Sequence, residues 1–268
     1  MHEFLYYQCL ELARAAAIVG VFLVLERLFP IESQPLRAKV FNIVFALGAF
    51  AVISAGGHLM VRTHQLVLQV RYDSVGVANF VGQHLDTVEL IGRILVYLLV
   101  VDFVSYWRHR AMHAWPVLWR IHRLHHSETS MNTTTARRDH WLNEFFYFLV
   151  VALPAMVLFG VFDVPSFVLY AYIAFPFYTH ANIRLGLGPL TRVFTGPQLH
   201  RIHHSRLPEH ADKNFAAMFP IFDIIFGTYH APKPGEYAAT GLISGETIDR
   251  QWQAHLEPFR RTSAETQR

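Results

Sequence analysis

Histidine is the residue whose number and spacing point most directly to chemistry in this chain. There are 17 histidines among 268 residues, and five of them lie between positions 109 and 126. His109 and His113 are four residues apart, whereas His122, His125 and His126 follow spacings of three and four. Residues three or four apart share one face of an α-helix. Each set therefore projects its imidazoles from a single helical face, as coordination of a metal ion requires.

The three-residue pattern returns further along the chain as His200, His203 and His204. The three histidine boxes together supply eight imidazoles, too many for one ion, and two ions with about four ligands each is the natural count. The only cysteine is Cys9, so thiolate metal sites and intrachain disulfides are excluded. Isolated histidines are usually capped, at the surface, or satisfied within the core, and we expect one of these roles for His2, His58, His64, His84, His210, His230 and His255.

The composition indicates that a lipid bilayer surrounds much of the chain. Hydrophobic residues make up 53% and charged residues only 16%, against about 25% charged in soluble domains. We expect apolar helices over residues 12–29, 40–61, 88–107, 145–160 and 164–178. The last two form a hairpin, because the histidine boxes on either side must share one compartment. Residues 215–226 are predicted to form an amphipathic or interfacial segment.

Arginine is concentrated around the histidine boxes, which by the positive-inside rule face the cytoplasm. The sequence thus predicts an all-α integral membrane protein with about four to five membrane helices and a cytosolic helical cap that holds a di-metal histidine cluster. The membrane is the inner membrane in a bacterium or the endoplasmic reticulum in a eukaryote, and the side of the N-terminus stays open. The net charge of +3 is too small to indicate a nucleic-acid partner.

Three motifs in this order resemble the fatty acid hydroxylase and sterol desaturase superfamily of membrane non-haem di-iron oxygenases. They are DFVSYWRHRAMH at 102–113, HRLHHS at 122–127 and TGPQLHRIHHS at 195–205, with further similar text at 135–140, 180–182 and 224–229. The resemblance implies that His180 is an additional ligand. The predicted metal ligands are then His109, His113, His122, His125, His126, His180, His200, His203 and His204.

Four other polar residues are candidates for supporting contacts behind the ligands. Asp102 lies two helical turns before His109 on the same face, and we expect it to pair with a ligand imidazole, Arg108 or Arg110. The other three, from segments similar to the family, are Arg138, His140 and Asn182. For His140, ligation, helix capping and substrate contact all stay open. No catalytic residue beyond the metal ligands is expected.

Imidazole ligands suit iron, zinc or copper alike. The expected lipid substrate distinguishes between these metals. Most lipid chains offer only unactivated C–H bonds, whose cleavage needs redox chemistry that zinc cannot perform. We therefore expect two iron ions (Fe²⁺/Fe³⁺) with O₂ as co-substrate, zinc being a possible substitute in purified protein. The expected reaction is hydroxylation or desaturation of a sterol, fatty acyl or sphingolipid C–H bond. The sequence has no haem-binding, dinucleotide or iron–sulfur motif, so electrons come from a separate cytochrome b5-, ferredoxin- or reductase-type protein.

Two alternatives remain beside this interpretation. Residues 126–136 resemble the corresponding segment of alkylglycerol-type monooxygenases, which favours ether-lipid cleavage as the second candidate. A zinc-binding membrane transporter or sensor is a candidate of a different class, although the boxes contain no acidic residue and lie outside the apolar segments. We divide the chain into N-terminal membrane anchor helices (1–87), a catalytic domain (88–230) and a polar C-terminal tail (231–268).

Overall fold

A computed structural model describes residues 2–75, 87–159 and 166–260, and the regular elements within these ranges are all helices. The prediction of an all-α fold is confirmed. The α-helices are α1 (His2–Leu28), α2 (Leu36–Val75), α3 (Thr87–Ala114), α4 (Pro116–His126), α5 (Trp141–Tyr147), α6 (Leu153–Phe159), α7 (Ser166–Thr179), α8 (Pro197–His203), α9 (Ile221–Ile225) and α10 (Gln251–Leu256). Short 3₁₀ turns are η2 (Thr133–Arg137), η4 (Gly188–Arg192), η5 (Pro208–His210) and η6 (Glu257–Phe259), and η3 (Phe148–Ala152) is a π-helical turn that joins α5 to α6.

The predicted apolar helices correspond to α1, α2, α3, the run from α5 to α6, and α7. Residues 160–165, which hold the predicted turn of the hairpin, lie outside the described residues. Two of the described segments are long and apolar enough to cross a membrane, Leu36–Gly56 and Trp141–Phe159. The larger number of spans and the cytosolic position of the histidine boxes remain proposals.

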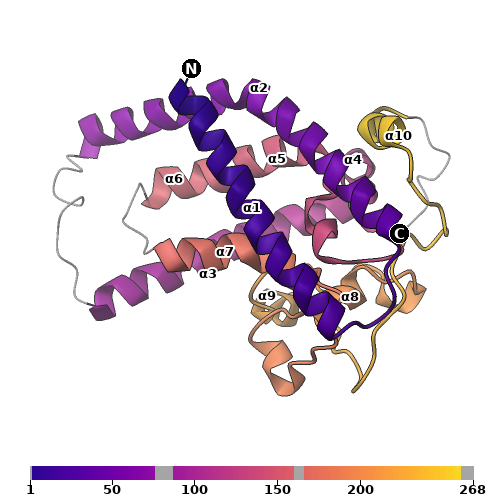
Figure 1. The fold of residues 1–268 in the computed structure, drawn as a ribbon. Helices are drawn as coiled ribbons and strands as arrows, with labels where there is room; N and C mark the ends of the chain where they lie inside the picture. The colour runs from indigo at the N-terminus through magenta and orange to yellow at the C-terminus, as the bar shows by residue number, and fades with distance from the viewer. Residues whose placement is uncertain (1, 76–86, 160–165, 261–268) are drawn as a thin grey trace.

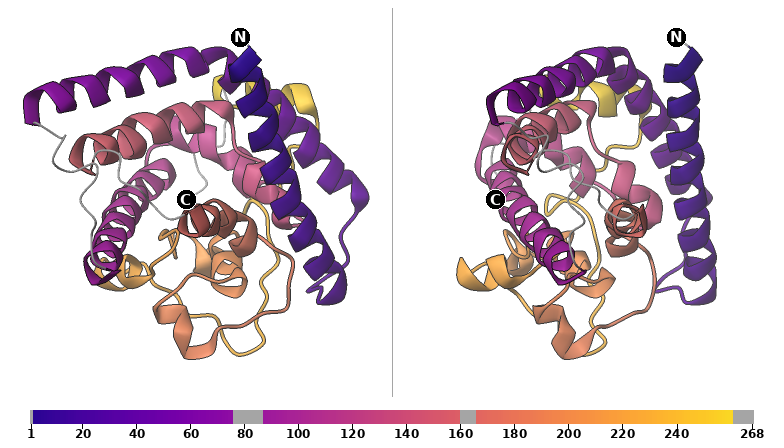
Figure 2. Two further views of the ribbon diagram at one scale, coloured as in Figure 1. Left: turned by 60° about the vertical axis from the view of Figure 1, so that its left-hand side comes forward. Right: turned by 90° about the vertical axis from the view of Figure 1, so that its left-hand side faces the viewer.

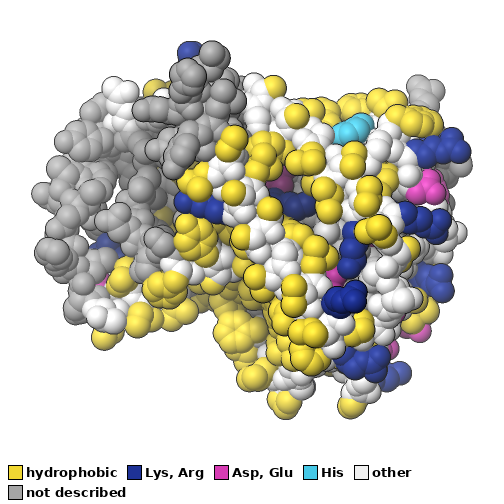
Figure 3. Space-filling model, in the orientation of Figure 1, with side chains coloured by type: hydrophobic (Ala, Val, Ile, Leu, Met, Phe, Trp, Pro, Cys, Tyr) yellow, Lys and Arg dark blue, Asp and Glu magenta, His cyan; other side chains and the backbone are white. Residues whose placement is uncertain are grey.

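The molecule has a long-helix end and a short-helix end. Parts of α2, α3, α6 and α7 extend toward one side, whereas α4, α8, α9 and α10 gather at the other, with α1 crossing the front (Figures 1 and 2). Hydrophobic side chains cover much of the visible face, and Lys and Arg gather over the short-helix end (Figure 3). Large apolar side chains stand exposed on the long helices, for example Val88 and Phe167 at 80% and 74%. Such apolar surface is costly in water and suits contact with lipid.

Glu26 fixes the end of α1 to the segments that flank the histidine boxes. Its side chain is 3% exposed. One carboxylate oxygen accepts hydrogen bonds from the backbone N–H groups of Thr133 at 2.6 Å and Asn182 at 2.9 Å, and the other pairs with Lys39 at 3.1 Å. A buried carboxylate is tolerated when it is paired and hydrogen-bonded in this way. Glu26 thereby ties α1, α2, the start of η2 and the loop after α7 into one unit.

Arg138 performs the same task for α2 and α4. Its buried guanidinium donates to the carbonyl oxygens of Leu124 and Ile248, to the hydroxyl of Ser127 and to the side-chain oxygen of Asn42 on α2. The planar fork of arginine can satisfy several acceptors at once. Segments distant in sequence are therefore joined at one buried point.

The segment after residue 230 folds back onto the helices. Arg123 on α4, 1% exposed, pairs with Glu246 at 2.6 Å and also with Glu257. The ring of His255 stacks on Phe45 of α2 with centroids 4.6 Å apart. The described part of the predicted polar tail is thus packed against α2 and α4.

Candidate metal centre

Nine histidine side chains come together in two neighbouring groups. The five-histidine group is His109, His113, His122, His126 and His203, and the four-histidine group is His125, His180, His200 and His204. Within each group the nitrogen atoms that could bind a metal lie within 4.8 Å of one another. The rings of His126 and His204, one from each group, have centroids only 4.4 Å apart. The fold therefore brings together all nine residues predicted from the sequence.

Local sequence explains where these histidines are placed. The chain leaves α3 and enters α4 after a single intervening residue, because Pro116 at the first turn of α4 begins a new helix. Pro197 begins α8 in the same way. Proline suits this position because its ring fixes φ and no N–H is needed there. His180 directly follows the last residue of α7.

The Nε2 atoms are spaced as ligands of a shared ion would be. Six pairs of Nε2 atoms within the groups lie 3.0 to 3.2 Å apart. Two nitrogens each about 2.1 Å from one ion are about 3.0–3.4 Å apart in octahedral or tetrahedral geometry. The Nε2 atom of His203 is buried and has no hydrogen-bond partner among the described residues. The donor set therefore fits two metal ions, one for each group.

Backbone carbonyl oxygens fix the orientation of three rings. The Nδ1 atoms lie 2.7–2.8 Å from these oxygens, in the pairs His109 with Phe215, His180 with Pro176 and His203 with Lys213. A carbonyl oxygen can only accept, so Nδ1 carries the proton in each pair. The lone pair is then on Nε2, which faces the other imidazoles.

Burial holds the nine imidazoles in the neutral form that binds metal. Desolvation lowers the pKa of every one of them, and neighbouring imidazoles lower it further for most. The pKa falls to about 4 for His180 and to about 3 for His203. Metal can therefore bind at neutral pH without displacing protons.

The expectation for Asp102 requires correction. Its carboxylate accepts hydrogen bonds from the backbone N–H groups of Ala217, Met218 and Phe219, at 3.1, 3.0 and 2.7 Å, rather than from an imidazole or arginine. These amides have no helical partner, since only Ile221–Ile225 of the predicted amphipathic piece is helical. Asp102 acts on the site indirectly, because this loop also carries the Phe215 carbonyl that orients His109.

The structure gives His140 one of its three open roles, helix capping, and places Asn182 and Arg138 in contact with other parts of the fold. His140 caps α5: its Nδ1 accepts from the Leu142 N–H and its Nε2 lies 3.0 Å from the carbonyl oxygen of His255. Both ring nitrogens are engaged, which leaves no lone pair for a metal. Asn182 joins its loop to the backbone of Glu32. Arg138 bonds to α2, α4 and the C-terminal segment. The hydrogen bonds described for these three residues therefore go to groups other than the nine imidazoles.

Two aspartates that the sequence did not single out lie behind the imidazoles. An oxygen of Asp139 lies 3.8 Å from Nδ1 of His122, and an oxygen of Asp212 lies 3.4 Å from Nδ1 of His113. Burial raises the pKa of Asp139 to about 7. Asp212 adopts φ = 56° in a loop. It is far from His113 in the sequence, and no local sequence pattern predicts their contact. The only sequence signal for Asp139 is its position directly before His140, in a segment similar to the family.

Comparisons with known proteins agree on one class of relatives. Residues 94–228 match the model of the fatty acid hydroxylase family. An alkylglycerol monooxygenase from Caenorhabditis elegans is 32% identical over 157 residues, 58% of this chain and 30% of the relative. An ornithine lipid hydroxylase from Rhizobium tropici is 30% identical over 171 residues, 63% of this chain and 51% of the relative. A methylsterol monooxygenase from Arabidopsis thaliana is 27% identical over 179 residues, 63% of this chain and 58% of the relative.

The chain spans between 30% and 58% of the length of these three relatives. No solved structure gives a significant match. The match to the family model covers half of the chain and contains all nine histidines of the two groups, in the order of the three boxes. On these grounds the chain belongs to the fatty acid hydroxylase family.

Proposed function

We propose that this protein is a membrane-bound di-iron oxygenase that uses O₂ and external electrons to hydroxylate or desaturate a C–H bond of a lipid. One observation carries the proposal: two adjacent groups of neutral, buried imidazoles lie at one end of apolar helices. An all-nitrogen ligand set of this kind suits a redox metal. The relatives named above as a lipid hydroxylase and monooxygenases support the same reaction class.

Each histidine group would hold one iron ion, and the bound pair would supply the redox chemistry with O₂ that breaks an unactivated C–H bond. The protein's own contribution is geometry and exclusion of water. The ring of Phe215 packs on His109, His113 and His203 with centroids 5.0 to 5.7 Å apart. Phe215 thus covers the five-histidine group with its ring while its carbonyl oxygen orients His109.

We further propose four to five membrane helices, a cytosolic cap and the three-part division of the chain at residues 87 and 230. The exposed apolar side chains of the long helices and the basic short-helix end support this orientation (Figure 3). A separate protein would deliver the electrons. The five- and four-histidine groups would then face the compartment from which that protein docks.

Cleavage of an ether lipid is the second candidate function. Alkylglycerol monooxygenases from several animals match this chain at 32–35% identity over 133–157 residues. Hydroxylation of the carbon next to an ether oxygen gives a hemiacetal, which collapses to an aldehyde and an alcohol. The same metal site could therefore perform this reaction on a different lipid. None of the relatives named above is a zinc transporter or sensor.

Metal analysis and lipid analysis of the purified protein test the proposal. We expect about two irons per chain after growth with iron, lost in the His125→Ala, His203→Ala double variant, which removes one imidazole from each group. His230→Ala is the control, because His230 belongs to neither group. With ¹⁸O₂ and reductant, hydroxylation gives a labelled alcohol, desaturation an unlabelled alkene, and ether cleavage an aldehyde. Absence of any stoichiometric metal from the wild-type protein would refute the proposal that the histidine groups bind two metal ions.

A further inference from the structure

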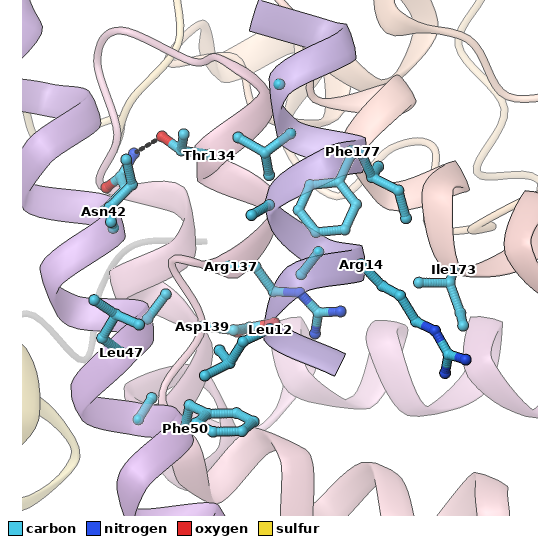
Figure 4. Close-up of a pocket in the computed structure, with 18 of the residues that line it drawn as sticks. Leu12, Arg14, Asn42, Leu47, Phe50, Thr134, Arg137, Asp139, Ile173 and Phe177 are labelled. Carbon is cyan, nitrogen blue, oxygen red and sulfur yellow. Dashed lines mark hydrogen bonds between the residues drawn. The ribbon is translucent and has the colours of Figure 1, made fainter. Parts of the chain in front are cut away.

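A cavity of about 510 Å³ lies between α1, α2 and α7, beside η2 and α5 (Figure 4). Its volume is within the range of about 300–1,000 Å³ that is typical of sites for one small ligand. Most of the side chains around it are aliphatic or aromatic. They include Leu12, Ala16, Leu23, Phe50, Ile173 and Phe177.

The cavity is elongated and largely separate from the segment that defines the family. The lining residues of α1 fall between positions 12 and 23, and those of α2 between positions 42 and 53. At 1.5 Å per residue each helix borders the cavity for about 16 Å. Both helices precede the family match, which begins at residue 94. The shape suits an extended chain, and α1 and α2 lie N-terminal to the family match, whereas α7 lies within it.

Charged side chains are confined to two places on the wall. Arg137 lies 3.7 Å from Glu144, and its guanidinium is 5.2 Å from the centre of the Phe177 ring. Asp139 is beside this pair, and Arg14 lies over the ring of Tyr170 at 5.5 Å. Both basic side chains are therefore already in contact with a neighbour, Arg137 with Glu144 and Arg14 with Tyr170. An anionic head group would have to compete with Glu144 for Arg137.

The polar part of the wall also borders the metal centre. Asp139 lines the cavity, and its Oδ1 atom lies 3.8 Å from Nδ1 of His122 in the five-histidine group. That oxygen is buried and has no hydrogen-bond partner among the described residues. One side chain therefore separates the cavity from an imidazole of the centre.

We propose that this cavity binds the alkyl chain of a single-chain lipid substrate whose head group has no net charge, with the chain along α1 and α2 and the head group against Arg137, Asp139 and Glu144. This assignment rests on the proposed function, because it places the substrate of that reaction. It identifies α1 and α2 as determinants of chain length.

Gly20 provides a test, because the first side-chain atom of a substitution there finds open space. A Cβ atom added at Gly20 meets nothing within 4 Å, although the residue lines the cavity. Gly92 on α3 is equally open but lies away from the cavity, so Gly92→Phe is the matched control for Gly20→Phe. Both substitutions replace a helical glycine with the same residue, and their effects on helix stability should be similar.

The first measurement is photolabelling with hexadecylglycerol that carries a diazirine on its chain, which needs neither metal nor O₂. We expect label in the peptides of α1 and α2, reduced about tenfold by Gly20→Phe and unchanged by Gly92→Phe. Unlabelled hexadecylglycerol should compete better than hexadecyl phosphate. Equal labelling of the two variants, or label in other peptides, would overturn the site; stronger competition by the phosphate would overturn the head-group assignment.

The second measurement distinguishes a substrate from a structural lipid. With lipids of graded chain length, Gly20→Phe should shift the oxidised products toward shorter chains, and Gly92→Phe should not. Unchanged products with reduced labelling would show that the cavity holds a structural lipid, which contradicts the proposal. If the wild-type protein oxidises no lipid while the labelling behaves as expected, the proposed function fails and the cavity assignment for an alkyl chain stands without a substrate role.

Discussion

Replacing Asp102 tests how the fold supports the metal centre from a distance. The carboxylate is 4% exposed and accepts hydrogen bonds from three consecutive amides, at 3.1, 3.0 and 2.7 Å. In Asp102→Asn one oxygen becomes an NH₂ group, so at least one amide loses its acceptor and faces a second donor. Leaving a buried donor unsatisfied costs about 1–3 kcal/mol. In Asp102→Ala all three amides lose their acceptor, and we expect a loss of at least about 3 kcal/mol.

The metal should also be held less firmly in these variants. The loop that Asp102 anchors carries the Phe215 carbonyl, 2.8 Å from Nδ1 of His109. Loss of contacts behind a metal ligand typically weakens metal binding about 10- to 100-fold. We therefore expect Asp102→Asn to release metal from the five-histidine group at about tenfold lower chelator concentration, with metal in the four-histidine group less affected.

Chelator titration followed by metal analysis, together with thermal unfolding in detergent, provides the assay. Glu89→Gln is the control: Glu89 is on the same helix, and its pair with Arg93 at 2.8 Å is exposed. Exposed helical pairs of this kind contribute about 0.3–0.5 kcal/mol. If Asp102→Asn and Glu89→Gln resist chelator and heat equally, the inferred link from Asp102 through the loop to His109 is wrong.

Three further predictions concern the α5 cap, the buried Arg123 ion pairs and the pKa values of the histidines. His140→Ala should lower stability by about 1 kcal/mol through loss of the α5 cap while metal content stays at the wild-type level; loss of metal would show that His140 is a ligand after all. Glu257→Gln leaves the buried Arg123 with Glu246 as its charged partner, and we expect destabilisation of up to about 3 kcal/mol. The control is Arg260→Gln, which removes the other ion-pair partner of Glu257 and leaves its pair with Arg123 in place. In metal-free protein the histidine pKa values lie below 6.5, at about 4 for His180, so the unfolded chain takes up protons first and stability should fall as pH drops below about 6.5; a flat thermal stability from pH 7.5 to 5.5 would contradict the burial of the centre.

The sequence determined the class of fold and the ligand set. Helical spacing places His109 with His113, and His122 with His126, on single faces regardless of what surrounds them. The apolar segments predicted the helices to within a few residues at most ends, because hydrophobic runs and proline at α4 and α8 are local signals. The exceptions are α1, which begins well before residue 12, and α2 and α3, which continue through polar residues beyond residues 61 and 107.

Only the tertiary structure decided how the nine histidines divide and what supports them. Sequence boxes group His122, His125 and His126, yet the fold assigns His125 to a different group from its two neighbours. The division depends on how α4 and α8 pack, which no local pattern encodes. Asp102 illustrates the same limit: its helical register pointed to an imidazole, whereas the unpaired amides of a loop more than 100 residues away proved to be its partners, because buried backbone donors must find an acceptor wherever the fold places one.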